Sequence, residues 1–171
     1  MNSKKKLFIT LYFLFLLVIG FLIFPDYGIS LDEDNTRING FVTLKYISEI
    51  FSPSFVVSIN EIINVPSMNN WSEQGIGVIF DLPTAFIELY FGITDSKNYY
   101  QMRHFVNFVF YFISVYFFFL LAKKRFNSLL FGLLGATLLV LSPRIFAQSF
   151  YNNKDIIFMS FFIIGLFTFI N

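Results

Sequence analysis

The chain contains no cysteine and only one histidine among its 171 residues. The lack of cysteine excludes disulfides, thiolate chemistry and metal sites built on thiolates, and one histidine cannot form a histidine cluster. Charged residues make up only 13% of the chain, with a net charge of +1, and basic patches interleaved with aromatics, typical of nucleic-acid binding, are absent. We therefore expect no nucleic-acid partner and any chemistry to depend on carboxylates, amides, hydroxyls and cations.

Apolar residues, by contrast, make up 56% of the chain and aromatic residues 22%, more than in an ordinary soluble domain. They occur in uncharged runs too long for a water-soluble core. The run 7–24 has 18 residues, which as a helix cover ~27 Å of bilayer. We predict an all-α integral membrane protein with about four transmembrane helices, near residues 7–24, 105–122, 126–141 and 156–170.

The first apolar run follows Lys4–Lys6, so a cleaved signal peptide is an alternative to a membrane anchor. Signal peptides have apolar regions of about 7–15 residues that end at small residues, whereas this run ends at Phe24 and Pro25. These features favour an anchor. Because the last run reaches Asn171, we expect residues 1–171 to be the N-terminal part of one polytopic membrane domain; a natural short protein is the alternative.

Basic residues flank the predicted helices at Lys4–Lys6 and Lys123–Arg125. The positive-inside rule assigns both flanks to the cytoplasm, so the N-terminus would be cytoplasmic and residues 25–104 and 142–155 would form periplasmic, extracellular or lumenal loops. All 11 acidic residues fall in these two loops. The same distribution would arise if the loops simply held most residues outside the membrane.

The long first outer loop is expected to contain helices, since loops beyond ~12–15 residues without secondary structure are uncommon. Ser30 and Glu33 match a capping box and predict an interfacial helix from about Leu31, with its apolar face on the membrane. A second such helix is predicted over residues 77–90. Residues 52–75 are rich in Asn, Ser and Pro and are expected to be irregular.

Asp32, Glu33 and Asp34 form the densest acidic cluster in the chain. An EF-hand calcium loop beginning at Asp32 would need glycine at its sixth position, where Arg37 stands. Acidic residues also favour the first turn of any helix, because the helix dipole stabilises negative charge there, and this gives a purely structural alternative. The same dipole would keep Asp32 ionised, which suits a general base at the membrane surface.

The second outer loop begins with Ser142 and Pro143, which predict a helix start. We expect one face of this helix to carry a polar stripe of residues at spacings of four, four and three: Arg144, Gln148, Asn152 and Asp155. Three polar neighbours widen the stripe: Tyr151, Asn153 and Lys154. Such a stripe is costly to bury in a membrane, so we expect it to face a water-filled cavity or a polar head group. Interfacial snorkelling of its two basic side chains is the alternative.

Arg103 and His104 add cationic groups at the outer start of the second predicted span. We expect these three clusters to meet at one level of the outer surface, with the Asp32 and Asp155 carboxylates on one cavity and ~10 Å or so apart. Cations would then hold the phosphate of a lipid head group while a carboxylate accepts a proton. The sequence leaves open whether a metal ion or other cofactor takes part.

A basic start, one predicted span and the segment Tyr27–Glu33 followed by Arg37 open the chain. This order resembles the opening of the GT-C glycosyltransferases, polytopic enzymes that use polyprenyl-phosphate sugars and include protein O-mannosyltransferases and lipid A aminoarabinose transferases. In that family an Asp-Glu pair follows the first helix. Residues 142–149 and Asn153–Asp155 are similar to the family's second outer loop, and Arg103 matches in position an arginine near the lipid phosphate.

The resemblance implies that Asp32 activates the acceptor, that Glu33 supports it and that Asp155 is a second acid. It implies an outer substrate-binding set of Arg103, Arg144, Tyr151, Asn152 and Lys154. The partners would be a polyprenyl-phosphate-linked sugar donor, a lipid, glycan or protein acceptor, and membrane lipids.

Two other classes of protein fit the sequence. A transporter or flippase fragment would have ionisable residues or Gly and Pro breaks inside its spans near the middle of the bilayer. A non-enzymatic membrane scaffold would leave the polar clusters far apart.

Overall fold

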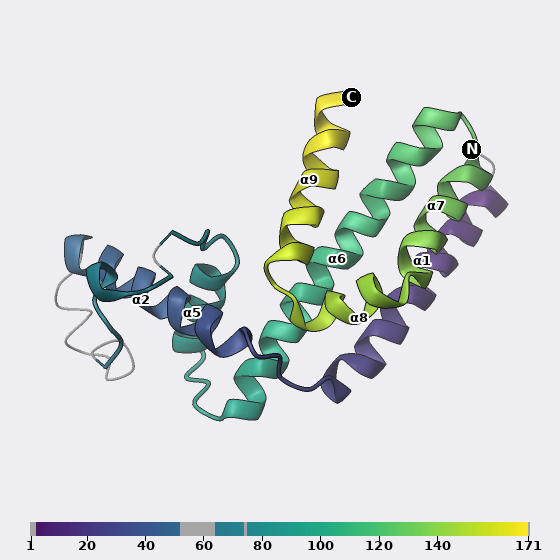
Figure 1. The fold of residues 1–171 in the computed structure, drawn as a ribbon. Helices are drawn as coiled ribbons and strands as arrows, with labels where there is room; N and C mark the ends of the chain where they lie inside the picture. Colours follow the sequence, from purple (N-terminus) through teal and green to yellow (C-terminus); the bar gives the residue numbers. More distant parts are fainter. Residues whose placement is uncertain (1–2, 52–63, 74, 171) are drawn as a thin grey trace. The chain divides into compact units, whose positions relative to one another are not determined.

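The computed structural model describes residues 3–51, 64–73 and 75–170. Over these ranges the chain is helical and contains no strand, which confirms the predicted all-α class. The elements in order (Figure 1) are α1 (Ser3–Ile23), η1 (Phe24–Asp26), α2 (Glu33–Phe51), η2 (Met68–Asn70), α5 (Asp81–Tyr90), α6 (Ser96–Phe126), α7 (Leu129–Leu141), α8 (Pro143–Tyr151) and α9 (Asp155–Ile170).

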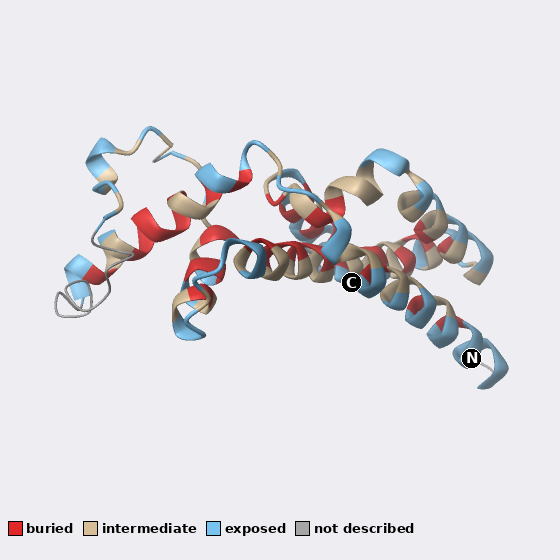
Figure 2. Cartoon of the chain, turned by 90° about the horizontal axis from the view of Figure 1, so that it is seen from below, coloured by how far each residue is buried: buried red, intermediate tan, exposed pale blue. Residues whose placement is uncertain are grey.

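The chain divides into two compact units. Unit 1 comprises Met1–Gly28 and Tyr100–Asn171, and unit 2 comprises Ile29–Tyr99. In Figure 2 the N-terminal part of α1 is largely exposed, whereas buried positions are frequent on α2 and α5.

Two helical segments are long and apolar enough to cross a membrane: Ser3–Asp26, with 24 residues, and α6, with 31. The pair α7 and α8 would provide a third span if counted as one, but it is bent by 68°. Helix α9 is apolar and has 16 residues. The chain is therefore an all-helical protein with two or three helices that could span a membrane, and the prediction of four spans is supported only in part.

Helix α6 packs against the other helices of unit 1 through aromatic rings. The α1 residue Phe13 meets the rings of Phe112 and Phe119 at centroid separations of 6.1 and 5.4 Å. On α9, Phe167 lies 5.1 Å from Phe117. Phenylalanine is a poor intrinsic helix former, but in a bilayer the backbone must satisfy its own hydrogen bonds, which favours helices throughout.

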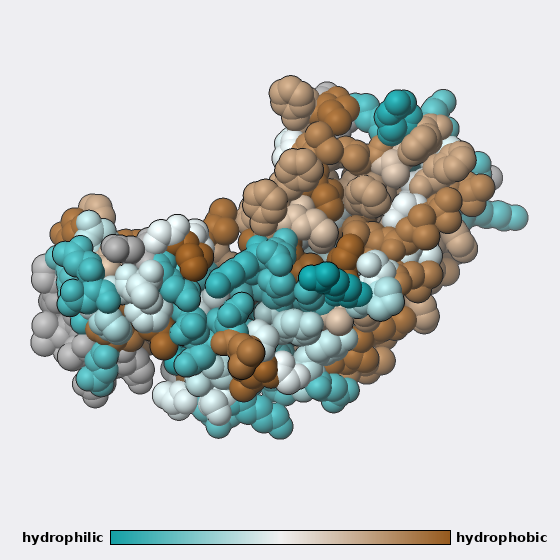
Figure 3. All heavy atoms as spheres, viewed as in Figure 1, coloured by the Kyte–Doolittle hydropathy of each residue, from teal (hydrophilic) through white to brown (hydrophobic). Residues whose placement is uncertain are grey.

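Two further contacts place α7 and α8 against this bundle. The hydroxyls of Tyr12 and Thr137 are 2.8 Å apart and join α1 to α7. The ring of Phe150 on α8 stacks on Phe108 of α6 at 5.2 Å. Apolar side chains cover much of the visible surface around α7 and α9 (Figure 3), as expected for helices in contact with lipid.

The turns of unit 1 explain where its helices end. Helix α6 continues through Lys123–Arg125 to Phe126, and Asn127 then has a left-handed φ of 47°, so α7 begins at Leu129 instead of residue 126. Ser142 is extended, with ψ 107°, as is usual before proline, and Pro143 opens α8. The predicted helix start after Ser142 is therefore present.

Unit 2 is built on the packing of α2 against α5. Phe41 and Leu44 of α2 form a small apolar cluster with Ala85 of α5. The backbones approach so closely that a Cβ on Gly40 would lie 2.3 Å from the carbonyl oxygen of Asp81. The apolar face predicted to rest on a membrane thus contributes to a protein core, and the interfacial location of α2 remains a prediction.

The helix limits in unit 2 differ modestly from the expected ones. Helix α2 begins at Glu33 instead of about Leu31, and α5 begins at Asp81 instead of residue 77. Much of the segment predicted to be irregular, residues 52–63 and 74, lies outside the described residues. Its described part contains only the short helix η2.

Candidate functional site

The three acids at the start of α2 have different environments. Asp32 is exposed and immediately precedes the helix, and its carbonyl accepts a hydrogen bond from the Thr36 amide at 3.0 Å. Glu33 is buried, and its Oε2 accepts a hydrogen bond from the Ser30 amide at 2.7 Å. This bond is one half of the predicted capping box. Asp34 is exposed. The carboxylate of Asp32 therefore lies in solvent at a helix N-terminus, where the dipole favours negative charge.

Arg37, one turn further along α2, forms an ion pair with Glu88 of α5. Its Nε lies 3.0 and 3.1 Å from the two Glu88 carboxylate oxygens, and Nη2 contacts the same carboxylate. The guanidinium also lies over the Tyr99 ring, 3.9 Å from its centroid. The Glu88 side chain is only 3% exposed and that of Arg37 is 19% exposed. This pair fixes α2 on α5 and so positions the acidic end of α2.

A second polar group joins the same two helices. The Asn39 Nδ2 donates to Asp81 Oδ2 at 3.4 Å, and Asn39 Oδ1 accepts from the Trp71 indole at 3.1 Å. Neither this group nor the pair of Arg37 with Glu88 was predictable from the sequence. The partners are 42 and 51 residues apart, and neither spacing carries a local sequence signal.

The second outer loop does not form one continuous polar stripe, so that prediction is wrong. Helix α8 ends at Tyr151, and Asn152 adopts a non-helical backbone with ψ 86°. Asn152 Oδ1 accepts from the Asp155 amide, and Asn152 Nδ2 donates to Asp155 Oδ2, both at 3.0 Å. These two bonds cap the start of α9. The stripe is interrupted because Asn152 begins a new helix instead of continuing α8.

The remaining members of the stripe differ in exposure. Arg144 and Asp155 are exposed, whereas Tyr151, Asn152 and Lys154 are half-buried and Asn153 is buried. Three of the predicted binding residues, Tyr151, Asn152 and Lys154, thus lie close together in the chain at the junction of α8 and α9.

Tyr27 brings the end of the first apolar segment to this junction. Its ring stacks on Phe150 at 4.3 Å and lies 6.1 Å from Tyr151. Partial burial, with the nearby Tyr151 as a smaller cause, raises the pKa of the Tyr27 hydroxyl above 10.0. Tyr27 therefore stays protonated at neutral pH and can donate a hydrogen bond.

Arg103 and His104 are buried on α6. One turn further, Asn107 is also buried, and its Nδ2 donates to the carbonyl of Gln148 on α8 at 3.4 Å. Buried polar residues at this depth in a long apolar helix are costly and usually have a specific role. The side chains of Arg103 and His104 are thus set within the protein and not spread along its surface.

The predicted site residues divide between the two units. Asp32 and Glu33 belong to unit 2, and the other six belong to unit 1, so the short separation expected for the Asp32 and Asp155 carboxylates remains a prediction. Among the residues that the structure describes, no three histidine or acidic side chains form a group able to hold a metal ion.

Comparisons with protein-family models, with curated proteins and with solved structures find no match to this chain. Its functional interpretation therefore depends on its own residues.

Proposed function

We propose that this chain is part of a membrane-bound glycosyltransferase that moves a sugar from a polyprenyl-phosphate donor to an acceptor. The observation that carries this proposal is the exposed Asp32 carboxylate, which follows the first apolar helix and directly precedes α2. The carboxylate of its neighbour Glu33 is buried and already accepts a hydrogen bond from the Ser30 amide. Asp32 is therefore the acid of this pair that can reach a substrate.

In the proposed reaction Asp32 is the general base. It takes the proton of the acceptor hydroxyl or amine as that group's lone pair attacks the anomeric carbon. The bond from this carbon to the phosphate oxygen breaks, and polyprenyl phosphate leaves with the bonding electrons. Attack from the opposite side inverts the configuration of the sugar.

The packing of α2 on α5 supports this role. A catalytic carboxylate must be held within a fraction of an ångström of its working position. The ion pair of Arg37 with Glu88 and the bonds of Asn39 hold α2 on α5. Asp32, in the turn that directly precedes α2, is thereby attached to the start of a helix held by these contacts.

The donor phosphate would be held by cations of unit 1. Arg144 is exposed on α8, and Lys154 follows the end of that helix. Guanidinium and ammonium groups make strong hydrogen bonds to phosphate oxygens, and they would also stabilise the charge that develops on the leaving group. Arg103, Tyr151 and Asn152 complete the proposed binding set, with Asp155 as the second acid.

Transport of a lipid-linked substrate is a second candidate function. Helices α7 and α8 are bent by 68°, and α6 buries Arg103 and His104. Broken helices and ionisable residues inside spans are typical of transporters. A transporter would not need a base at Asp32, which separates the two candidates experimentally.

The test compares Asp32→Asn with Asp34→Asn in membranes that contain the full gene product. Transfer would be followed with a radiolabelled polyprenyl-phosphate sugar, and binding by retention of the same donor. We expect Asp32→Asn to abolish transfer with donor binding nearly intact, because a general base acts in the reaction and not in binding. The exposed Asp34 is the matched control and should tolerate the change.

Arg144→Ala and Lys154→Ala test the donor contacts. Each should weaken donor binding by about 1.5–3 kcal/mol, the value of a charged hydrogen bond. If Asp32→Asn and Asp34→Asn behave alike, the acids are a solvated helix start and the catalytic assignment fails.

A further inference from the structure

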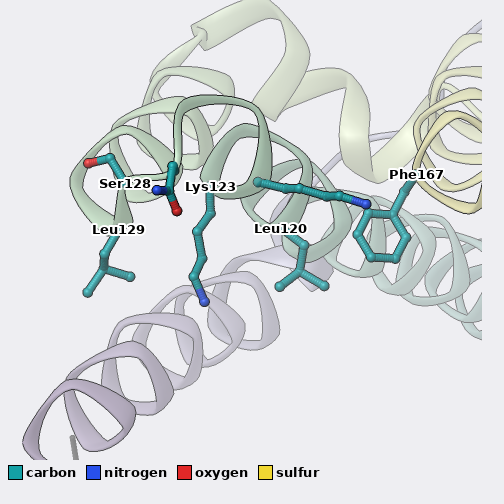
Figure 4. A pocket seen from close by; sticks show the side chains of 7 residues that line it. Leu120, Lys123, Ser128, Leu129 and Phe167 are labelled. Atoms are coloured by element: carbon teal, nitrogen blue, oxygen red, sulfur yellow. The ribbon is translucent and has the colours of Figure 1, made fainter. Parts of the chain in front are cut away.

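A hollow of about 320 Å³ lies at the end of α6 opposite to Arg103. Its polar lining comes from Lys123, Lys124, Asn127 and Ser128, and its apolar lining includes Leu120 and Phe167. Figure 4 shows Lys123 between Leu120 and Leu129, with Phe167 approaching from α9. All of these residues belong to unit 1.

A second hollow of about 310 Å³ adjoins the first, because Lys124 and Phe167 line both. Its other lining residues include Leu121 and Arg125. The two hollows therefore combine the three consecutive cations at the end of α6 with an apolar surface between α6 and α9.

Along α6 these hollows lie where the sequence predicts a membrane boundary. The apolar part of the helix ends at Ala122, and three basic residues follow at once. The neighbouring Phe126 and Leu130 are 60% and 72% exposed, which is natural for side chains in contact with lipid. A basic pocket between helices at this depth matches the chemistry of a lipid head group.

The individual side chains are suited to a phosphate. Lys123 is half-buried and lines the hollow, and its Nζ lies 6.0 Å from the Phe119 ring centroid, within the range of a cation–π contact. Within the described residues, the Ser128 side chain makes no capping hydrogen bond to α7. Its hydroxyl and the first amides of this 13-residue helix are thus able to donate to an anion.

We propose that this paired hollow binds an anionic phospholipid. The head-group phosphate would contact Lys123, Lys124 and Ser128, and an acyl chain would lie along the apolar surface that includes Leu120 and Phe167. A free phosphate ion would use only the cationic part of the lining. The mixed lining therefore favours a whole lipid, and the site is independent of the proposed sugar transfer.

The experiment measures lipid binding to the full chain in detergent micelles by native mass spectrometry. Phosphatidylglycerol should bind in preference to phosphatidylcholine. Because each lysine would donate a charge-assisted hydrogen bond to the bound phosphate, which contributes about tenfold or more in affinity, the double variant K123Q/K124Q should lose ~100-fold in phosphatidylglycerol affinity. K123R/K124R keeps both charges and should retain most of the binding.

The matched control is K5Q/K6Q, which removes two exposed lysines at the start of α1. It should change affinity less than about twofold. An equal loss in both double variants would mean general attraction to charge and would overturn the proposal. Equal binding of phosphatidylcholine, or complete displacement of phosphatidylglycerol by millimolar inorganic phosphate, would do the same.

Circular dichroism would check that K123Q/K124Q remains helical. If it does not, Ser128→Trp provides the decisive variant, because it fills the hollow without changing the charge. Reduced phosphatidylglycerol binding by Ser128→Trp would support the proposal, and unchanged binding would refute it.

Discussion

The two units of this protein are held together by different chemistry. The core of unit 1 consists largely of stacked and edge-on rings, among them Phe13, Phe108 and Phe150. Among the described residues of unit 2 the apolar cluster is small, and α2 and α5 are also joined by polar pairs, of Arg37 with Glu88 and of Asn39 with Asp81. The helices of unit 1 thus pack largely through aromatic rings, whereas those of unit 2 also depend on buried polar pairs.

The difference reflects what each core must achieve. Helices in lipid gain little from apolar burial, since lipid tails are equally apolar, and depend on close van der Waals packing. A core with buried polar groups depends on every group having a partner, and such pairs fix the register of the helices. Both units nevertheless use a glycine at a close approach, Gly20 beside Phe108 and Gly40 beside Asp81.

The largest expected difference between the units is the side of the membrane on which their loops lie. The basic flanks predict that unit 2 is outside and the turn after α6 is inside. Ser67 of unit 2 is exposed and Ser128 lies in that turn. We expect a cysteine at Ser67 to react with an impermeant thiol reagent in intact cells, and a cysteine at Ser128 to react only after permeabilisation.

The natural chain has no cysteine, so each variant reports one position without background. Labelling of both positions from outside would overturn the orientation. Protection of Ser67 alone would reverse it and would place Asp32 on the wrong side for an externally delivered donor.

The sequence predicted the parts of this structure that are encoded locally. Uncharged runs identified α1 and α6, and the spacing of Ser30 and Glu33 located the start of α2 within two residues. The interruption at Asn152 was missed, because four-residue spacing cannot distinguish one helix from two that meet at a cap. The pair of Arg37 with Glu88 was missed because only tertiary packing brings α2 and α5 together.

The burial of Arg103 was also beyond sequence reasoning. A basic residue at the start of an apolar run is equally typical of a snorkelling side chain, and only the packing around α6 shows that this one is buried. For the candidate site, residue types and order were predictable, whereas their exposure and mutual distances were not.

Breaking the ion pair of unit 2 should have the largest effect on stability. Glu88→Ala leaves the Arg37 guanidinium without its carboxylate in a largely buried position, and the loss of one partner of a buried pair costs about 3 kcal/mol. Amide hydrogen exchange of α2 should then be ~100-fold faster, with α1 unchanged.

The control for this change is Glu49→Ala, which removes an exposed acid from the same helix. It should alter exchange of α2 by less than about threefold, as for most surface substitutions. Equal acceleration by the two variants would show that the ion pair does not define unit 2.

Substitution of Gly20 and Gly40 tests how well the core of each unit accommodates an added methyl group. A Cβ on Gly40 would lie 2.3 Å from a backbone oxygen of Asp81, whereas a Cβ on Gly20 would lie 1.8 Å from the tip of the Phe108 ring. A ring can shift more easily than a backbone, so Gly40→Ala should cost about 3 kcal/mol and Gly20→Ala about 1–2 kcal/mol. Unit-resolved hydrogen exchange would measure both changes.

Gly165→Ala is the reference, because the methyl group that alanine adds at this position of α9 would meet no neighbouring atom within 4 Å. It should be neutral or stabilising by up to about 1 kcal/mol through helix propensity. A greater loss from Gly20→Ala than from Gly40→Ala would mean that the aromatic core is the less adaptable of the two.

Helix capping gives the smallest expected contrast. Asn152 caps α9 with its side chain, so Asn152→Ala should destabilise the start of α9 by about 1 kcal/mol. At the start of α2 the bond runs from the Ser30 backbone amide to the Glu33 side chain. Ser30→Ala retains that donor and should change the exchange of α2 very little.

Asp155→Asn separates capping from chemistry at the same position. The amide oxygen of asparagine can still accept from Asn152 Nδ2, and the backbone bond from residue 155 to Asn152 Oδ1 is unaffected, so α9 should lose only a few tenths of a kcal/mol, from the charge at its N-terminus. If Asp155 is the second acid of the proposed transferase, sugar transfer should nevertheless fall at least tenfold. If sugar transfer and the hydrogen exchange of α9 are both unchanged, Asp155 acts only in the helix cap. The proposed chemistry would then depend on the Asp32 carboxylate alone.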